Sequence, residues 1–385
     1  MKVGVPKESF PGENRVALIP ASVQALLKKG FEVHVQSGAG MNAGFKDDEY
    51  SEKGAAIVNE RGEVFKNSDI ILQVRAYPAN PERGKSDLDL IHDGQVIIGM
   101  TESLSEPRLN EHVAQKGATL FSMELMPRIT RAQSMDVLSS MASIAGYKAV
   151  LIAAEHLPKM FPMMMTAAGT ISAAKAFIIG AGVAGLQAIA TAKRLGASVK
   201  AYDIRPAVKE QVQSLGADFV ELELETGTSE DKGGYAKAMD EEFYRRQREL
   251  MTGVIKDSDV VITTAAVPGK KAPILITSEM VKDMNPGSVI VDLAAERGGN
   301  CDFTEAGEII DYNGITVAGP LNIPATVPYH ASQMYAKNIS TFLTHIIKEG
   351  RIDFNLEDEI TKDTMVARGG EIVHPHVLEI LRGAK

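Results

Sequence analysis

Residues 175–185, which read KAFIIGAGVAG, constrain the fold more than any other part of the chain. A short apolar run leads directly into three glycines with the spacing GxGxxG, and a helical pattern follows them. In a strand–turn–helix unit, Gly180 permits the tight turn, Gly182 lets a ligand approach the backbone, and Gly185 lets helix and strand pack closely. The first amides of such a helix bind anions. The motif therefore predicts a dinucleotide-binding α/β unit; the alternative is a glycine-rich turn without a ligand.

The next predicted strand, residues 199–203, ends in an acidic residue. Asp203 lies 23 residues after Gly180, close to the spacing of about 20 at which a carboxylate binds the ribose 2′-hydroxyl. Since this carboxylate would repel a 2′-phosphate, we expect a preference for NAD(H) over NADP(H), which Arg205 weakens slightly. A later strand, 260–264, ends at the same edge of the predicted sheet. The predicted dinucleotide contacts also include Val183, Ala184, Ile204, Arg205, Thr264 and Ala265.

Short runs rich in Val and Ile alternate with helical patterns along the sequence. The predicted strands are residues 3–5, 31–35, 69–74, 95–99, 119–122, 176–179, 199–203, 260–263, 288–292 and 315–318. This alternation predicts parallel sheets covered by helices. We therefore expect an α/β protein with two Rossmann-like, doubly wound domains, linked by long helices over residues 134–157 and 332–348.

A chain of 385 residues has room for two domains of ordinary size. Because both long helices can cross between domains, we expect the N-terminal Rossmann-like domain to be discontinuous. It is expected to take in residues 1–135 plus about 330–385, and the NAD(H)-binding domain residues 136–329.

Composition and charge exclude several classes of function. With 41 Lys and Arg against 50 Asp and Glu, the net charge is −9, and no basic patch for nucleic acid is evident. The single cysteine, Cys301, excludes an internal disulfide and a multi-cysteine metal site, and we expect no metal. Charges at Lys7 and Glu8 argue against a signal peptide. The longest uncharged run, 176–192, is too short to span a bilayer. We expect a cytoplasmic protein without direct membrane insertion.

The polar segment 128–140 lies where the first long helix is expected to begin. Gln133, Asp136 and Ser140 have the spacing i, i+3, i+7, which predicts one shared helix face. An amide, a carboxylate and a hydroxyl on one face can bind the carboxamide of a nicotinamide ring and fix its rotation. Arg128 could neutralise a phosphate or hold Asp136. The alternative is a polar first turn with an aspartate at a helix N-terminus.

Residues 221–242 form a second unusual segment, because they combine several acidic residues with glycines. We interpret them as a long surface loop, and long loops in compact domains are usually functional or disordered. The alternative is a tolerated acidic insertion.

These motifs resemble one family over essentially the whole chain. The shared features are VGVPKE, ENRVALIP, GAGVAGLQAIATAKRLGA, VPGKKAPILIT and VDLAAERGG. Three further segments resemble one branch of this family specifically: ELMPRITRAQSMDVLSS, FPMMMTAAGT and GGYAKAM. The chain is similar to the soluble NAD(H)-binding alpha subunit, first component, of proton-translocating nicotinamide nucleotide transhydrogenases, in a wider group that includes alanine dehydrogenases.

The resemblance implies a function that needs other subunits. Hydride would pass directly from NADH bound here to NADP+ bound on a partner subunit, while membrane-spanning subunits translocate the proton; the sequence leaves the Si-specific class open. It implies a homodimer, peripheral on the cytoplasmic face of the inner membrane. Gln133, Asp136 and Ser139 would orient the nicotinamide, with Arg128 and Ile129 beside it. Gly234 and Tyr235, in GGYAKAM, would belong to a flap that folds over bound nucleotide.

Two alternatives stay open. An alanine dehydrogenase would use a lysine, a histidine and an aspartate, but this chain carries Arg75 and Glu296 at two of these positions and has no histidine between His92 and His112. Losing all three would remove the general acid–base groups. Arg15 is retained, and its simplest role is structural. The second alternative is a non-catalytic NAD-sensing module, which the missing acid–base groups fit as well.

Overall fold

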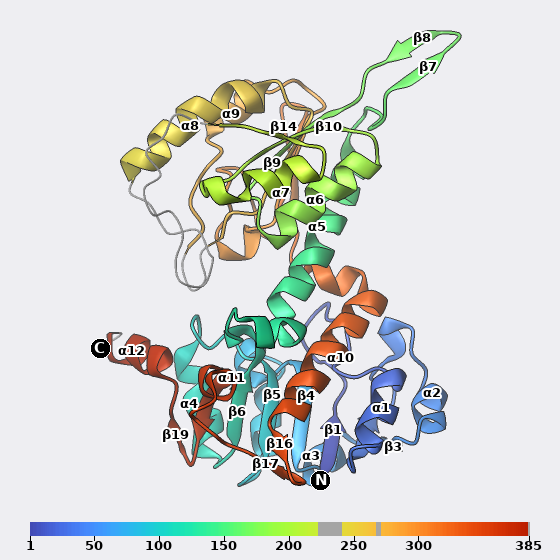
Figure 1. The fold of residues 1–385 in the computed structure, drawn as a ribbon, viewed down its shortest axis with the longest axis vertical. Helices are drawn as coiled ribbons and strands as arrows, with labels where there is room; N and C mark the ends of the chain where they lie inside the picture. Colours follow the sequence, from blue (N-terminus) through green and yellow to red (C-terminus); the bar gives the residue numbers. More distant parts are fainter. Residues whose placement is uncertain (222–240, 267–270, 384–385) are drawn as a thin grey trace. The chain divides into compact units, whose positions relative to one another are not determined.

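The computed structural model describes residues 1–221, 241–266 and 271–383. Its contacts divide the chain into two compact units (Figure 1). Unit 1 consists of Met1–Met141 and Pro324–Lys385, and unit 2 of Ala142–Ile323. Each unit is described by itself. The expected boundaries near residues 135 and 330 stay a prediction about independently folding domains.

Unit 1 is built on an eight-stranded sheet in the order β19-β18-β6-β5-β4-β1-β2-β3. Its strands are β1 (Lys2–Val5), β2 (Glu32–Gln36), β3 (Ala56–Val58), β4 (Ile70–Arg75), β5 (Val96–Met100), β6 (Thr119–Ser122), β18 (Met365–Arg368) and β19 (Glu371–Ile372). Strands β1 to β6 pair in parallel. Strand β18 runs antiparallel to β6, and β19 antiparallel to β18. The strand order reverses between β1 and β4, as in doubly wound folds.

The helices of unit 1 come from both ends of the chain. They are α1 (Pro20–Leu27), α2 (Asp47–Glu52), α3 (Arg61–Lys66), α4 (Pro107–Gln115), α10 (Pro328–His345), α11 (Glu359–Thr364) and α12 (Pro375–Gly383). A short hairpin, β16 (Ile347–Lys348) and β17 (Arg351–Ile352), follows α10. One core cluster contains Phe65, Ile97 and Val366. The C-terminal residues therefore complete the core of the first third of the chain.

Unit 2 contains a seven-stranded sheet in the order β11-β10-β9-β12-β13-β15-β14. Its strands are β9 (Lys175–Ile179), β10 (Ser198–Tyr202), β11 (Asp218–Phe219), β12 (Val260–Thr263), β13 (Val289–Asp292), β14 (Ile309–Tyr312) and β15 (Ile315–Ala318). All pair in parallel except β14, which runs antiparallel to β15. The strand order reverses between β9 and β12, and ligands bind doubly wound sheets outside the carboxyl ends of strands at this point.

Both faces of the unit 2 sheet are buried. Helices α6 (Val183–Arg194), α7 (Lys209–Ser214), α8 (Glu241–Lys256) and α9 (Ser278–Lys282) belong to this unit. Along β9, Ile178 joins one core cluster while Phe177 and Ile179 join the other. Burial on both faces explains why the strand has a continuous apolar sequence rather than an alternating one.

The ten strands predicted from the sequence agree with the structure to within one residue at each end. The predicted doubly wound, mostly parallel sheets are confirmed, and the strands that run antiparallel in them are β14, β18 and β19. These three strands have only two to four residues each, so the sequence gives them too short a periodic signal. The predicted loop 221–242 is wrong at its end, because α8 begins at Glu241. The rest of that segment, except Glu221, lies outside the described residues.

Helix α5 (Val137–His156) begins in unit 1 and continues into unit 2. Among the described helices it alone has the length and composition of a membrane span, with a mean hydropathy of 1.5. The sequence prediction had overlooked this property. Ala149, Val150 and Ala153 are nevertheless fully buried in the core of unit 2. One face of α5 therefore packs in the core of unit 2, while 39% of its apolar window as a whole is buried.

A two-stranded hairpin, β7 (Met164–Thr166) and β8 (Gly169–Ile171), projects from the rest of unit 2 (Figure 1). Every residue of both strands is exposed. Met165 is 78% exposed and Met163 is 59% exposed. The hairpin thus presents apolar side chains to the surroundings, and its two strands were not predicted from the sequence.

Candidate functional site

The turn after β9 holds the first glycine of the GxGxxG motif. Gly180 has φ = 97°, in the left-handed region that favours glycine. A Cβ atom there would lie 2.4 Å from the Thr264 hydroxyl oxygen. The Gly180 amide donates a hydrogen bond of 2.8 Å to the Tyr202 carbonyl at the end of the neighbouring strand. The turn is therefore fixed between β10 and β12 at the point where the strand order reverses.

Helix α6 starts immediately after this turn and packs very close to it. A Cβ atom on Gly185 would lie 1.8 Å from the Gly180 carbonyl oxygen, a separation that no structure tolerates. The internal packing of the protein therefore explains glycine at both Gly180 and Gly185.

Gly182 differs, because the protein itself supplies no reason for a glycine there. Its φ of −72° and ψ of −170° are open to any residue. Apart from the adjoining backbone, nothing lies within 4 Å of the position that a Cβ atom would occupy. Gly182 is the N-cap of α6, so the amides of Val183, Ala184 and Gly185 lie at the positive end of the helix dipole. The free space and the helix N-terminus together can receive a pyrophosphate.

Asp203 follows β10 and is 8% exposed. Its carboxylate accepts hydrogen bonds from the Ala181 amide at 2.7 Å and from the Arg205 amide at 2.9 Å. The Arg205 guanidinium donates to both carboxylate oxygens, each at 2.9 Å. Asp203 thus fixes the glycine-rich turn and is paired with the arginine that the sequence places two residues later. The ribose role predicted for it requires Arg205 to give way.

The loops after β12 and β13 complete this edge of the sheet. Thr264 donates to the Gly180 carbonyl at 3.2 Å, and the Ala265 amide donates to the Asn300 side chain at 3.1 Å. Asp292 is fully buried and accepts hydrogen bonds from the Asn300 amide at 2.6 Å and from the Thr304 hydroxyl at 2.6 Å. Sequence reasoning did not single out Asp292, the last residue of β13, or Asn300 in the loop that follows, although the carboxyl end of a predicted strand was a signal for them.

The segment 128–140 belongs to unit 1 and differs from its prediction. Gln133 lies in a 3₁₀ helix, η5 (Thr130–Met135), and Asp136 is extended between η5 and α5. The prediction that Gln133, Asp136 and Ser140 share one helix face is therefore wrong. A 3₁₀ turn followed by an extended residue interrupts the helical spacing on which that prediction depended.

Asp136 caps the N-terminus of α5. Its carboxylate accepts hydrogen bonds of 2.9 Å from the Ser139 amide and 2.5 Å from the Ser139 hydroxyl. This is the polar first turn that the sequence left open as an alternative. Gln133 and Arg128 are exposed, and Ile129 is half-buried. Both carboxylate oxygens of Asp136 already have Ser139 donors, and each keeps a further lone pair for a ligand.

Unit 1 also buries the arginine that the sequence analysis treated as structural. Arg15 is 2% exposed, and its guanidinium donates to both oxygens of the Glu13 carboxylate at 2.7 and 2.6 Å. Arg75 lies 3.4 Å from the same carboxylate. Burial lowers the pKa of Arg15, but the hydrogen bonds and charge of Glu13 outweigh this and keep the pKa raised. An internal carboxylate therefore engages both arginines.

The predicted residues fall into two groups. The carboxyl edge of the unit 2 sheet holds Gly180, Gly182, Val183, Ala184, Gly185, Asp203, Ile204, Arg205, Thr264 and Ala265. Unit 1 holds Arg128, Ile129, Gln133, Asp136 and Ser139. Gly234 and Tyr235 lie outside the described residues. Within the described part of the chain, no cluster of three or more His, Cys, Asp or Glu side chains could hold a metal ion.

Comparisons with known proteins identify the family of the chain. Residues 4–145 match the N-terminal domain of the alanine dehydrogenase/PNT family, and residues 149–375 match its C-terminal domain. The chain is 47% identical to the first component of NAD(P) transhydrogenase subunit alpha of Rhodospirillum rubrum, over 97% of this chain and 98% of that protein. It is 28% identical to an alanine dehydrogenase of Methanococcus maripaludis, over 91% of this chain and 88% of the relative.

A solved transhydrogenase structure is also similar to this chain. The crystal structure of a transhydrogenase from Sinorhizobium meliloti superposes with a TM-score of 0.86 at 45% sequence identity. The match covers 97% of this chain and 100% of that chain.

Proposed function

The chain belongs to the alanine dehydrogenase/PNT family, and from this membership we propose that it is the NAD(H)-binding component of a proton-translocating transhydrogenase. In this proposal, hydride passes directly between NADH bound here and NADP+ on a partner subunit. Membrane-spanning subunits couple the transfer to proton translocation, and the chain is peripheral to the cytoplasmic face of the membrane.

The observation that carries the nucleotide-binding part of the proposal is the free space at Gly182. Packing and backbone conformation account for Gly180 and Gly185, but the protein has room for a side chain at Gly182. A glycine that the fold does not need is explained by a ligand that must approach the backbone closely. The amides at the start of α6 then bind the pyrophosphate.

The roles of the other residues follow from their chemistry. Bound NADH supplies the hydride. Asp203 accepts hydrogen bonds from the adenosine ribose and disfavours a 2′-phosphate, while Gln133, Asp136 and Ser139 orient the nicotinamide carboxamide, with Arg128 and Ile129 beside it. Hydride transfer between two nicotinamides moves no proton, so orientation and exclusion of water are sufficient for catalysis.

The decisive experiment mixes the purified chain with NADH, the NADP(H)-binding subunit and a thio-substituted NADP+, whose reduced form absorbs at its own wavelength. We expect rapid reduction with the partner subunit and none without it. NADH binding without transfer would favour an NAD-sensing module. Robust alanine-dependent reduction of NAD+ by the chain alone would falsify the assignment.

The contacts of Arg15 and Arg75 with Glu13 in unit 1 disfavour the alanine dehydrogenase alternative. A dehydrogenase acting on an amino acid needs a cation free to bind the substrate carboxylate. Here the buried guanidinium of Arg15 is already held by both oxygens of Glu13. An outside carboxylate would have to displace this internal one.

Asp203→Ala tests the cofactor preference. Removing the carboxylate should weaken NADH binding about tenfold, as expected for a charged hydrogen bond. It also releases Arg205, which can then bind a 2′-phosphate, so NADPH affinity should rise. Both affinities can be measured by the fluorescence of the bound nucleotide. Asp218→Ala, at an exposed aspartate of the same sheet, is the matched control. An unchanged ratio of the two affinities would exclude the ribose role.

The hairpin β7–β8 supports the proposed homodimer. A two-stranded sheet with exposed methionines is only marginally stable in water and needs a surface to cover it. Met163→Glu combined with Met165→Glu should therefore shift the chain from dimer to monomer, as measured by light scattering after size-exclusion chromatography. Met41→Glu, at a methionine that is 54% exposed in unit 1, should leave the mass unchanged. A double variant that remains dimeric would contradict this interface.

A further inference from the structure

The segment η5, which carries Gln133 and precedes Asp136, has little internal support. It is a six-residue 3₁₀ helix, and such helices rarely exceed three or four residues because their hydrogen-bond geometry is poor. Ala132 and Met135 are buried, whereas Gln133 and Ser134 are exposed. The conformation of η5 must therefore be fixed by contacts with other elements.

One such contact comes from α10. Asn338 is 5% exposed, and its side-chain amide donates a hydrogen bond of 2.9 Å to the Ser134 carbonyl. This bond holds the backbone of η5 next to the exposed Gln133. It joins residues that lie 204 positions apart in the sequence.

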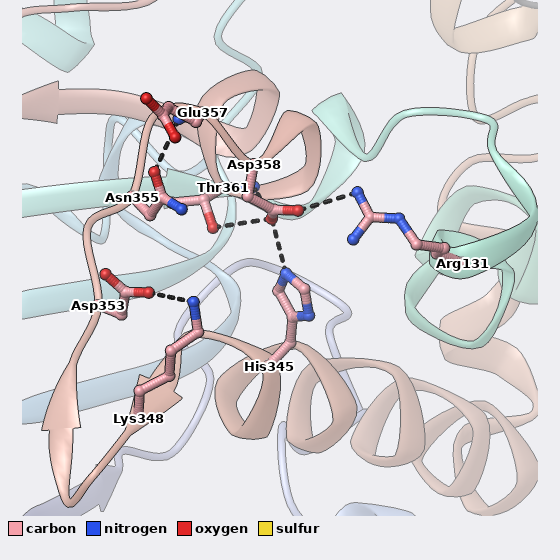
Figure 2. A pocket seen from close by; sticks show the side chains of 8 residues that line it. All are labelled: Arg131, His345, Lys348, Asp353, Asn355, Glu357, Asp358 and Thr361. Carbon is pink, nitrogen blue, oxygen red and sulfur yellow. Dashed lines mark hydrogen bonds and ion pairs between the residues drawn. The ribbon is translucent and has the colours of Figure 1, made fainter.

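A second contact reaches the other end of η5 through Asp358. Figure 2 shows the Asp358 carboxylate between Arg131, on η5, and His345, at the end of α10. One oxygen accepts a hydrogen bond of 2.9 Å from Arg131, and the other accepts one of 2.7 Å from His345. The second oxygen also accepts from the amide and hydroxyl of Thr361, both at 3.1 Å. Asp358 is thus the N-cap of α11. Its carboxylate is held by residues of α10 and α11 and also contacts Arg131 of η5.

The charge of Asp358 is stable. Burial acts to raise its pKa, but the hydrogen bonds from His345, Thr361 and Arg131 outweigh burial and keep the pKa well below its usual value. The carboxylate therefore stays ionised throughout the pH range in which enzymes of this kind are assayed.

The surrounding cavity, with a volume of about 400 Å³, is lined by charged side chains that pair with one another. The lining also includes an ion pair that does not involve Asp358, in which Lys348 Nζ lies 2.5 Å from Asp353 Oδ2 (Figure 2). The Lys348–Asp353 pair does not reach η5. It therefore provides an internal control for the effect of breaking an ion pair in this pocket.

We propose that Asp358 is a positioning residue that, bridging His345 and Arg131, holds η5 in the conformation in which Gln133 and Asp136 meet the nicotinamide. This inference rests on the proposed function. An ion pair with a half-exposed arginine contributes little to global stability. Its effect is on the geometry of one short segment, and small displacements of orienting groups slow a reaction strongly.

Asp358→Asn is the first test. Asparagine caps helices as well as aspartate does, so α11 should remain folded while the ionic bonds to Arg131 and His345 are lost. We expect hydrogen–deuterium exchange of a peptide covering residues 129–137 to accelerate about fivefold, as for the loss of about 1 kcal/mol of local stability. Hydride transfer to the partner subunit should slow about five- to tenfold, while the Kd for NADH changes less than about twofold.

Arg131→Gln removes the same bond from the other side and should reproduce both effects. The double variant should then add nothing further, since the two residues act through one contact. Lys348→Met should leave exchange and rate unchanged. The inference is overturned if η5 exchanges at the wild-type rate in both single variants, or if Lys348→Met has the same effect as they do. Absence of hydride transfer in the wild-type protein would instead reject the proposed function, while the exchange experiment would still report on the bridge.

Discussion

Gly182→Val is expected to weaken NADH binding by at least about 100-fold, because a side chain would fill the space through which the pyrophosphate approaches the helix amides. The protein itself should tolerate the change. The backbone of Gly182 is extended, a conformation that valine favours, and nothing lies within 4 Å of the new Cβ atom. Tm should therefore shift by only a few degrees, and titration of NADH followed by fluorescence measures the affinity.

Two other glycines provide the controls for this experiment. Gly253, in α8, also has nothing within 4 Å of a Cβ position, so Gly253→Ala should stabilise the protein by about 0.5–1 kcal/mol and leave NADH binding unchanged. Gly185→Ala should instead destabilise unit 2 severely, since its Cβ would lie 1.8 Å from a carbonyl oxygen. If Gly182→Val binds NADH like the wild type, the glycine-rich turn does not receive the pyrophosphate.

Asp136→Asn is expected to slow hydride transfer about 100-fold, the loss that a misplaced reactant produces, with little change in NADH affinity. The structure sharpens this prediction because Asp136 is the N-cap of α5. Asparagine preserves a cap, so the variant separates the proposed orienting role from the structural one. Stopped-flow measurements with the partner subunit give the transfer rate, and fluorescence titration gives the affinity.

Asp136→Ala supplies the complementary result. It removes the cap as well and should cost about 1 kcal/mol of stability. If Asp136→Asn transfers hydride at the wild-type rate while Asp136→Ala merely lowers Tm, the aspartate serves only as a cap. Equal losses of rate and affinity in Asp136→Asn would mean that the residue serves binding alone.

The sequence predicted the parts of the fold that depend on local pattern. Strands such as β9 and β12 are apolar on both faces, so their positions follow from composition alone. The turn at Gly180 follows from a motif whose residues are neighbours in the chain. The antiparallel strands β14 and β18 were not predicted, because each is only four residues long and gives too short a periodic signal.

The arrangement of the candidate site depended on contacts that no local pattern reveals. Asp203 was singled out from the sequence by its spacing from Gly180. Its hydrogen bonds with Arg205 and with the Ala181 amide exist only in the folded turn and could not be predicted. Asn338 and Asp358 reach η5 from more than 200 residues away. A single sequence contains no periodicity that links such positions. The prediction that Gln133 and Asp136 share a helix face was wrong for a different reason. Their spacing fits one helix, but the segment is a 3₁₀ helix followed by an extended residue.

The pairing of Asp203 with Arg205 also bears on how long a nucleotide stays bound. If the ribose hydroxyl takes its place on this carboxylate, the guanidinium must first withdraw, and the cost of separating the pair offsets part of the binding free energy. When the nucleotide leaves, the arginine is two residues away and returns to the carboxylate at once. The pair therefore favours a short residence time, which suits the proposed function, in which NAD+ has to be exchanged for NADH after each hydride transfer.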